Sequence, residues 1–128
     1  MPNEENFPKL GPIVIGTADM ERAKKFYIAV FGITILNDES SHHVNARAVD
    51  GTHIELEGDS PHRFPDWAKH NVGTYKNSEF VVKDIHAFME TVEQNGERVV
   101  TNPTPRPWGG YGAEIADPDG NIFLISER

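Results

Sequence analysis

Polar and apolar residues alternate along residues 50 to 57, which read DGTHIELE. Successive side chains of a β-strand point to opposite faces, so His53, Glu55 and Glu57 are predicted to share one face and the two aliphatic residues the other. The pattern predicts a strand that buries its aliphatic face and presents an imidazole and two carboxylates opposite. Metal enzymes use such a polar row, but solvated strands have one too. Features elsewhere in the chain are needed to distinguish a metal site from a solvated strand face.

The first half of the chain adds a helix and three more strands. The stretch PIVIGT is predicted as a strand, and Asp19 can then cap a helix whose apolar residues recur at helical spacing and which Gly32 would end. The stretches ITILND and HVNARAVD predict two further strands before DGTHIELE. Asp50-Gly51 is a common two-residue hairpin turn and would join the last two strands.

The second half repeats this order. SEFVVK predicts a strand, Asp84 caps a helix that ends before Gly96, and RVVTN, GAEIA and NIFLIS predict three strands. The two capping aspartates lie 65 residues apart, and Asp50-Gly51 and Asp119-Gly120 lie 69 apart. The order indicates an internal duplication.

We therefore predict one α+β domain of two tandem β-α-β-β-β units, about residues 12–57 and 77–126, with residues 58–76 as the linker. Two sheets that each carry a helix on one face leave the other face free to curve around a cleft. Site residues are expected in that cleft, at alternate strand positions. The alternative is that two α+β halves agree by chance.

Composition limits the classes of function. The 128 residues include no cysteine, and 20 acidic against 12 basic residues give a formal charge of −8. Disulfides, thiolate zinc sites and a cysteine nucleophile are thus excluded, and an acidic chain without a basic cluster disfavours nucleic acid as a partner. No apolar run approaches the roughly 18 residues of a membrane helix, and the start MPNEENFPKLG is unlike a signal peptide. We expect a cytoplasmic protein with no membrane partner.

Three stretches carry a family resemblance: ADMERAKKFYIAVFGI, VVKDIHAFMETVEQNGERV and PWGGYGAEIADPDGNIFLI. With them, residues 12–126 resemble the vicinal oxygen chelate superfamily, which includes glyoxalase I, extradiol dioxygenases, fosfomycin-resistance enzymes and bleomycin resistance proteins. The resemblance implies paired β-α-β-β-β units, and a homodimer that builds its cleft partly between chains. It implies no single activity, because members share the fold and differ in chemistry.

In metal-dependent members of this superfamily, the ligands lie on the first and last strands of each unit. Carried over by the resemblance, these positions are Pro12, Glu55, Asn77 and Leu124. One carboxylate and a weak amide oxygen do not make a catalytic divalent site, which normally takes about three protein donors. We expect no metal cofactor, which disfavours glyoxalase, fosfomycin-transferase and dioxygenase activities.

A displaced divalent metal site around His53, Glu55 and Glu79 is the alternative. Residues two apart on one strand face lie about 6 to 7 Å from each other, too far to converge without another strand. The other histidines, including His43, are expected on the exposed surface.

Aromatic residues are expected at the edges of the cleft. Phe64 and Trp67 fall in the linker, and Trp108 and Tyr111 in the loop before GAEIA. Stacking or cation–π contacts there would suit a planar or cationic ligand. The alternative is that each tryptophan covers the core under its loop.

The leading hypothesis is a small-molecule binding protein similar to the bleomycin resistance branch, which sequesters a planar or cationic compound in an acidic cleft without a metal. One alternative is a lyase or isomerase of glyoxalase type with a non-standard divalent metal ion, and another is a structural or regulatory role. The candidate ligand-binding residues face the cleft from strands or bordering loops: His53, Glu55, Glu57, Asn77, Glu79, Trp67, Trp108 and Tyr111.

Overall fold

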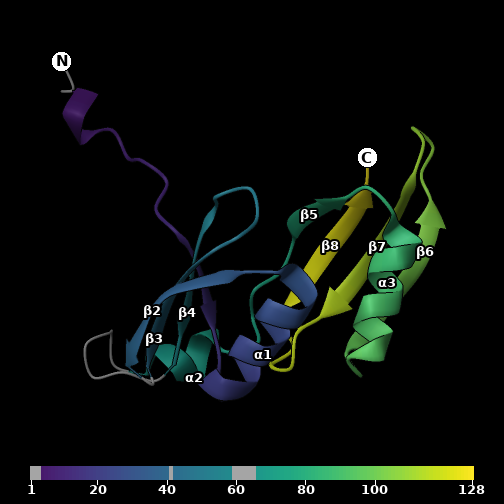
Figure 1. Cartoon of the computed structure of the whole chain (residues 1–128). Helices are drawn as coiled ribbons and strands as arrows, with labels where there is room; N and C mark the ends of the chain where they lie inside the picture. The colour runs from purple at the N-terminus through teal and green to yellow at the C-terminus, as the bar shows by residue number, and fades with distance from the viewer. Residues whose placement is uncertain (1–3, 41, 59–65) are drawn as a thin grey trace.

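A computed structural model of the chain describes residues 4–40, 42–58 and 66–128 (Figure 1). These residues form two four-stranded sheets, and each sheet carries one helix on one of its faces. The predicted α+β fold of two tandem β-α-β-β-β units is confirmed. The N-terminal segment extends away from the first unit (Figure 1).

The first unit contains five elements: β1 (Ile13–Gly16), α1 (Met20–Phe31), β2 (Thr34–Ser40), β3 (His43–Arg47) and β4 (His53–Glu57). They form sheet A in the order β1-β4-β3-β2, with β1 parallel to β4 and the other pairs antiparallel. As predicted, the Asp19 carboxylate caps α1 by accepting from the Arg22 N–H at 3.1 Å, and Gly32 follows the helix at φ 64°.

The second unit repeats the arrangement with β5 (Ser78–Val82), α3 (Ile85–Gln94), β6 (Arg98–Pro105), β7 (Tyr111–Ala116) and β8 (Ile122–Glu127). Sheet B has the order β5-β8-β7-β6, in which β5 is parallel to β8. The Asp84 carboxylate caps α3 by accepting from the Ala87 N–H at 3.1 Å. The two units therefore share topology and capping geometry.

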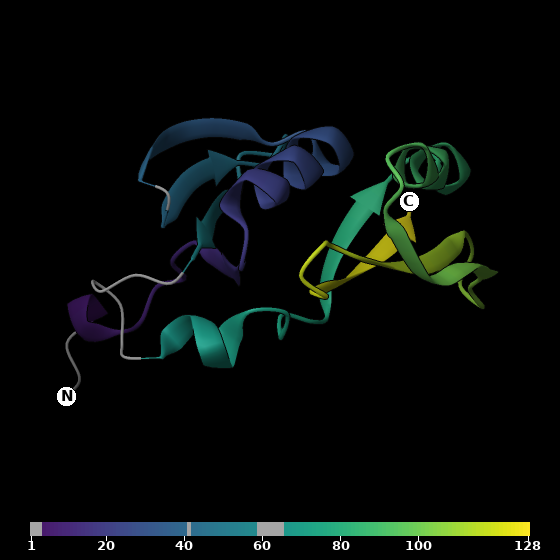
Figure 2. The same cartoon turned by 90° about the horizontal axis from the view of Figure 1, so that it is seen from below.

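The described part of the linker holds a short helix that the sequence pattern did not predict, α2 (Trp67–Asn71). α1 and α3 lie on one side of the two sheets and α2 on the other (Figure 2). After α2, Val72 pairs with the free edge of β1 at Gly16, where a Cβ would lie 3.0 Å from the Asn71 carbonyl oxygen. The end of the linker therefore packs along the outer edge of β1, with β1 between it and Glu57, which is paired with Gly16 in sheet A.

A single core runs under both helices. Ile54 and Leu56 are fully buried, as the alternation in DGTHIELE predicts. At the end of α1 the ring of Phe31 stacks on Phe80 of β5 at 4.4 Å between centroids and meets Phe123 of β8 at 5.3 Å. The first unit's helix thus contributes apolar surface to the second unit, and the two units fold as one hydrophobic body. No helix in the described residues is long and apolar enough to cross a membrane.

Both Asp-Gly pairs form turns, but the predicted two-residue hairpin is wrong. The Gly51 N–H donates to the Ala48 carbonyl, and the Ala48 N–H donates to the Thr52 carbonyl, both at 2.9 Å. The loop therefore has three residues and ends in a left-handed glycine at φ 89°. Residues 117–121 repeat this pattern, with Gly120 at φ 94°.

Asp119, in the turn of residues 117–121, connects the second unit to the first. The Asp119 carboxylate accepts from the Thr17 hydroxyl at 2.6 Å and from the Ala18 N–H at 2.9 Å, and it pairs with Arg22 at 3.3 Å. Its side chain is only 2% exposed. This buried carboxylate stabilises the contact between the two units, because separating them would break all three of its interactions.

Tyr27 makes a second buried contact with this turn. Its hydroxyl donates to the Asp117 carboxylate at 2.5 Å, and Asn121 donates to the same carboxylate at 2.8 Å and to the Gly16 carbonyl at 3.1 Å. Burial, and then the negative charge of Asp117, raise the pKa of Tyr27 well above its ordinary value. The phenol is therefore held in its neutral, hydrogen-bond-donating form.

Candidate functional site

The open face of sheet A is the face opposite α1. Because β3 and β4 pair in antiparallel register, His43 lies opposite Glu57, Asn45 opposite Glu55, and Arg47 opposite His53. The open face therefore presents two parallel rows of polar side chains. They are His43, Asn45 and Arg47 on β3, and His53, Glu55 and Glu57 on β4.

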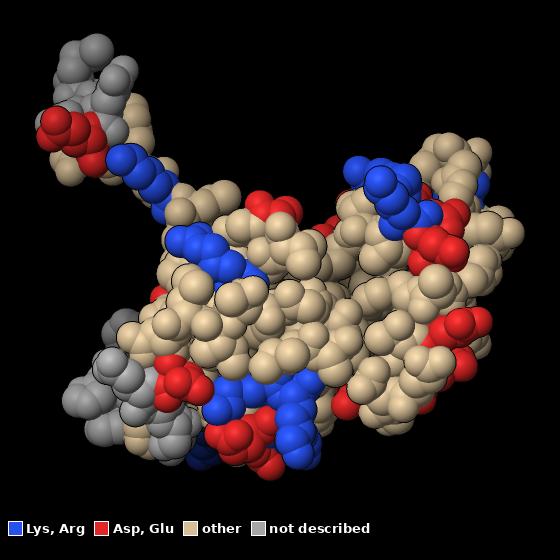
Figure 3. Space-filling view, in the orientation of Figure 1, with Lys and Arg blue, Asp and Glu red and all other residues tan. Residues whose placement is uncertain are grey.

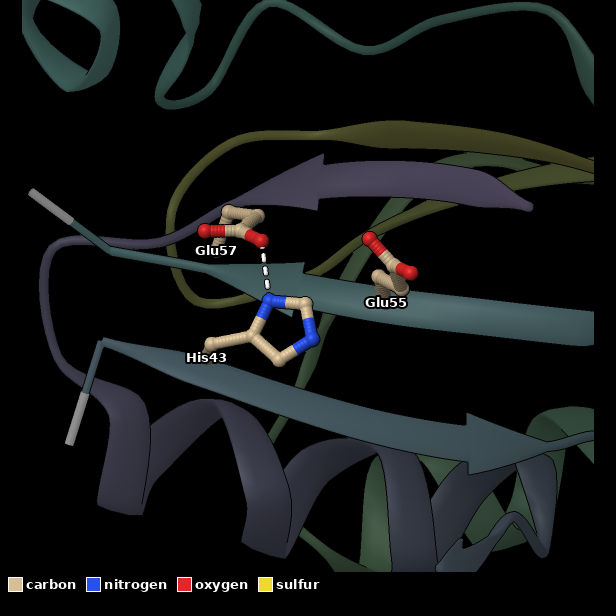
Figure 4. A group of neighbouring side chains, drawn as sticks. All are labelled: His43, Glu55 and Glu57. Carbon is tan, nitrogen blue, oxygen red and sulfur yellow. Dashed lines mark hydrogen bonds and ion pairs between the residues drawn. The ribbon is translucent and has the colours of Figure 1, made fainter. Parts of the chain in front are cut away.

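His43 and Glu57 form a hydrogen-bonded pair on this face. The His43 Nδ1 atom is hydrogen-bonded to the Glu57 carboxylate, and the second ring nitrogen points away from Glu57 (Figure 4). Glu57 is 2% exposed, while His43 is half-buried. The expectation that His43 belongs to the exposed surface is wrong, because the register of the hairpin brings it onto the open face beside a buried carboxylate.

Glu55 completes a group with this pair. One ligand atom each from His43, Glu55 and Glu57 lies within 4.8 Å of the others. The imidazole comes from the neighbouring strand, which supplies the convergence that one strand alone cannot give. The group can bind a cation or donate and accept hydrogen bonds to a polar ligand.

The structure does not assemble the predicted alternative metal set of His53, Glu55 and Glu79. His53 Nε2 lies 3.1 Å from the Asn45 side-chain oxygen, away from the group around Glu57. Glu79 belongs to β5 of sheet B. His43 and Glu57, which that prediction omitted, take their places beside Glu55.

Glu79 is the centre of its own small network. Its carboxylate accepts from the Ser126 hydroxyl and from the Arg128 guanidinium, each at 2.8 Å. It also lines a cavity of about 390 Å³ between the units, with Ile13 and Phe80 among the other lining residues. Its charge is therefore compensated by Arg128.

The metal that the resemblance implies does not fit the residues present. Pro12 precedes β1 and has no side-chain donor atom, and Leu124 is aliphatic. Asn77 is exposed just before β5 at φ 70°, and only Glu55 offers a carboxylate. This donor set cannot satisfy a divalent ion.

The predicted aromatic residues lie at two separate places. Trp67 begins α2, which packs against β1 of sheet A. Phe64 lies outside the described residues. Trp108 and Tyr111 line a cavity of about 500 Å³ at the end of sheet B, together with Lys83, Arg106 and Arg128 among other residues.

Trp108 does not cover the core, because it is 77% exposed. Its ring lies 5.4 Å from the Arg106 guanidinium carbon. The cavity around it is basic, although the sequence contains no basic run. The fold brings together here basic side chains that are far apart in the sequence.

Sequence reasoning missed His43 and Asn45, and a signal for them exists. Counting outward from Asp50 by equal numbers of residues pairs His43 with Glu57 and Asn45 with Glu55. Lys83, Arg106 and Arg128 have no such signal, because they come from three distant parts of the chain.

The sequence profile of the Glyoxalase/Bleomycin resistance protein/Dioxygenase superfamily matches residues 9–125. No curated protein matches the sequence significantly.

Several solved structures share the fold. UcmS2 aligns with a TM-score of 0.78 at 22% identity over 95% of this chain and 99% of its own. TnmS3, an antibiotic binding protein from Streptomyces sp. CB03234, aligns with a TM-score of 0.73 at 23% identity over 95% and 97%. TioX from Micromonospora sp. ML1 aligns with a TM-score of 0.73 at 18% identity over 91% and 98%.

Proposed function

The chain belongs to the Glyoxalase/Bleomycin resistance protein/Dioxygenase superfamily, and on that premise we propose that it binds a planar or cationic small molecule without a catalytic metal. The binding surface is the open face of sheet A. The protein acts by sequestration, holding the compound against this acidic face.

One observation carries this proposal: Glu55, Glu57 and His43 converge on the open face while the family's other ligand positions hold no suitable donor. Two carboxylates within reach of one point attract a cation. Glu57 is buried and fixes the imidazole, so Glu55 is the carboxylate that a ligand meets first. A cationic ligand gains charge-assisted hydrogen bonds there.

The remaining predicted residues take different places in this proposal. His53, held by Asn45, forms the rim of the open face, and Trp67 offers an aromatic edge from α2. Asn77, just before β5, and Glu79 on β5 belong to the second unit and would reach the same ligand from a second copy, in a homodimer that builds its cleft between chains. Trp108 and Tyr111 line the separate basic cavity, so we place them in a second site. 

The homodimer is a prediction that light scattering at micromolar concentration tests. The cytoplasmic location and the absence of a nucleic-acid partner are also predictions. TnmS3 supports the class of function, because a protein of the same fold is described as antibiotic binding.

Titration with proflavine, a planar tricyclic cation, tests the proposal. We expect saturable fluorescence changes with a Kd below about 1 mM, and binding weakened by rising salt. Glu55→Gln should weaken binding about three- to tenfold, since it removes a charge at unchanged size. Glu93→Gln, an exposed change on α3, is the matched control.

Absence of saturable binding, or equal loss in both variants, contradicts the proposal. Neutral 9-anthracenemethanol serves as the uncharged comparison. If it displaces proflavine with equal affinity, the charge of the acidic face has no role in recognition.

A second candidate function is a metal-dependent lyase or isomerase of glyoxalase type. The observation that favours it is the spacing of His43, Glu55 and Glu57, since imidazole and carboxylate oxygens suit several divalent ions. Elemental analysis of protein purified without chelator separates the two functions. A stoichiometric transition metal lost in His43→Ala would favour the enzyme, whereas metal-free protein that does not bind added Ni, Zn, Mn or Fe rules it out.

A further inference from the structure

The basic cavity is the space at the end of sheet B that Lys83, Arg106, Trp108, Tyr111, Ser126 and Arg128 line, with a volume of about 500 Å³. It lies where β5 and β8 end and the β6–β7 hairpin turns back. Lys and Arg side chains gather over this end of the molecule, at the upper right of Figure 3. Lys83 is six residues beyond Asn77, roughly 20 Å along the strand, and Ser126 is two residues beyond Leu124, so the basic cavity lies past the family's ligand positions, toward the ends of β5 and β8.

The cations of the basic cavity are only partly neutralised. Arg128 pairs with Glu79, and the Glu127 carboxylate in the lining accepts from the Ile85 N–H at 3.0 Å. Among the described residues, neither Lys83 nor Arg106 has a carboxylate oxygen within 4.0 Å. The lining therefore carries three cations against the single carboxylate of Glu127, and this excess of positive charge, in a chain with a formal charge of −8, favours an anion locally.

The Arg106 side chain packs against the β6–β7 hairpin. Its guanidinium lies over Gly112, where a Cβ would meet the Nε and Nη2 atoms at 2.0 Å. The backbone of the hairpin tip is closed by the Arg106 N–H to the Gly110 carbonyl at 2.9 Å and the Gly109 N–H to the Arg106 carbonyl at 3.0 Å. A planar guanidinium fork matches the two oxygens of a carboxylate.

Trp108 supplies the second part of the recognition. Its ring is 77% exposed and lies beside the guanidinium, so a planar compound that stacks on it also reaches the charge. Stacking would remove apolar surface from water that the folded chain leaves exposed. A volume of about 500 Å³ is in the range of small-molecule pockets, about 300 to 1,000 Å³.

We propose that the basic cavity binds a planar aromatic carboxylate. The acid group binds Arg106 and Lys83, and the aromatic part stacks on Trp108. Ser126 and Tyr111 offer hydroxyl groups at the wall of the cavity. This site is independent of the open face of sheet A and selects the opposite charge.

Calorimetric titration with 9-anthracenecarboxylate tests this proposal, with neutral 9-anthracenemethanol as the comparison. We expect saturable binding of the acid with a Kd below about 1 mM and at least about tenfold weaker binding of the alcohol. Arg106→Gln should weaken the acid about tenfold and leave the alcohol unchanged within about twofold. Trp108→Ala should weaken both compounds, because it removes the stacking surface.

Arg98→Gln is the matched control, since Arg98 is an exposed arginine at the other end of β6. Circular dichroism of each variant shows whether it is folded, and Lys83→Gln replaces Arg106→Gln if the latter unfolds. No saturable binding below about 1 mM, equal affinity for acid and alcohol, or an equal loss in Arg98→Gln would overturn the proposal. Because proflavine reports on the open face and the acid on the basic cavity, either proposal can fail alone.

Discussion

Glu55 and Glu57 look alike in the sequence but differ in burial. Glu57 is 2% exposed and bonded to His43, whereas Glu55 is only partly buried in the same row. A buried carboxylate is stable only with its hydrogen bonds made, so Glu57 positions its neighbour. Glu55 is the residue that a ligand can reach.

Tyr27 gives a prediction about pH. Its pKa is raised in the folded protein by burial and by Asp117. The folded state then keeps a proton that the unfolded chain loses above about pH 10, so stability should fall as pH rises through that value. Tyr27→Phe should cost about 1 to 3 kcal/mol at pH 7, because it removes a hydrogen bond to a charged group, and should flatten the alkaline decline.

Urea unfolding between pH 7 and 11 measures both effects. Tyr111→Phe is the matched control, because its ring is only half-buried. An alkaline decline of the same steepness in Tyr27→Phe and wild type would contradict this account of the buried phenol.

At the scale of elements, local patterns predicted most of the fold. The capping aspartates, the glycine after α1 and the alternation along β4 all have local physical causes, and all are confirmed. The two-residue hairpin was wrong because an Asp-Gly pair also suits a three-residue loop with a left-handed glycine. α2 was missed because five residues carry too little periodic signal.

The two N-caps should make equal contributions. Asp19 and Asp84 have the same extended backbone and accept from an N–H at the same 3.1 Å. Asp19→Ala and Asp84→Ala should each lower the free energy of unfolding by about 1 kcal/mol, and the double variant by about the sum. Urea unfolding checks this, with Glu90→Ala on the exposed face of α3 as a control; a loss below about 0.3 kcal/mol in both single variants would show that the caps matter little.

At the scale of the molecule, contacts between distant residues decide the site. His43 lies beside Glu57 only after the hairpin sets its register, and the basic cavity needs four strands of sheet B to be in place. Sequence patterns report neighbours along an element, so they could propose Glu55 and Glu57 but not the cations around Trp108.

The contacts of Asp119 with the first unit give a prediction about the stability of the whole fold. Asp119→Ala would remove the carboxylate that accepts from the Thr17 hydroxyl and the Ala18 N–H and that pairs with Arg22. We expect a loss of about 2 to 4 kcal/mol in the free energy of unfolding. Asp38→Ala is the control, since Asp38 pairs with Lys24 while 52% exposed and should change stability by less than about 0.5 kcal/mol.

The central claim is that the open face of sheet A binds a small cationic molecule. Titration of isotope-labelled protein with proflavine, followed by amide nitrogen–proton correlation spectra, locates the binding directly. We predict that the largest shift changes fall in residues 43–47 and 53–57 and that Glu55→Gln reduces them. No changes, or changes concentrated on sheet B, would contradict the claim.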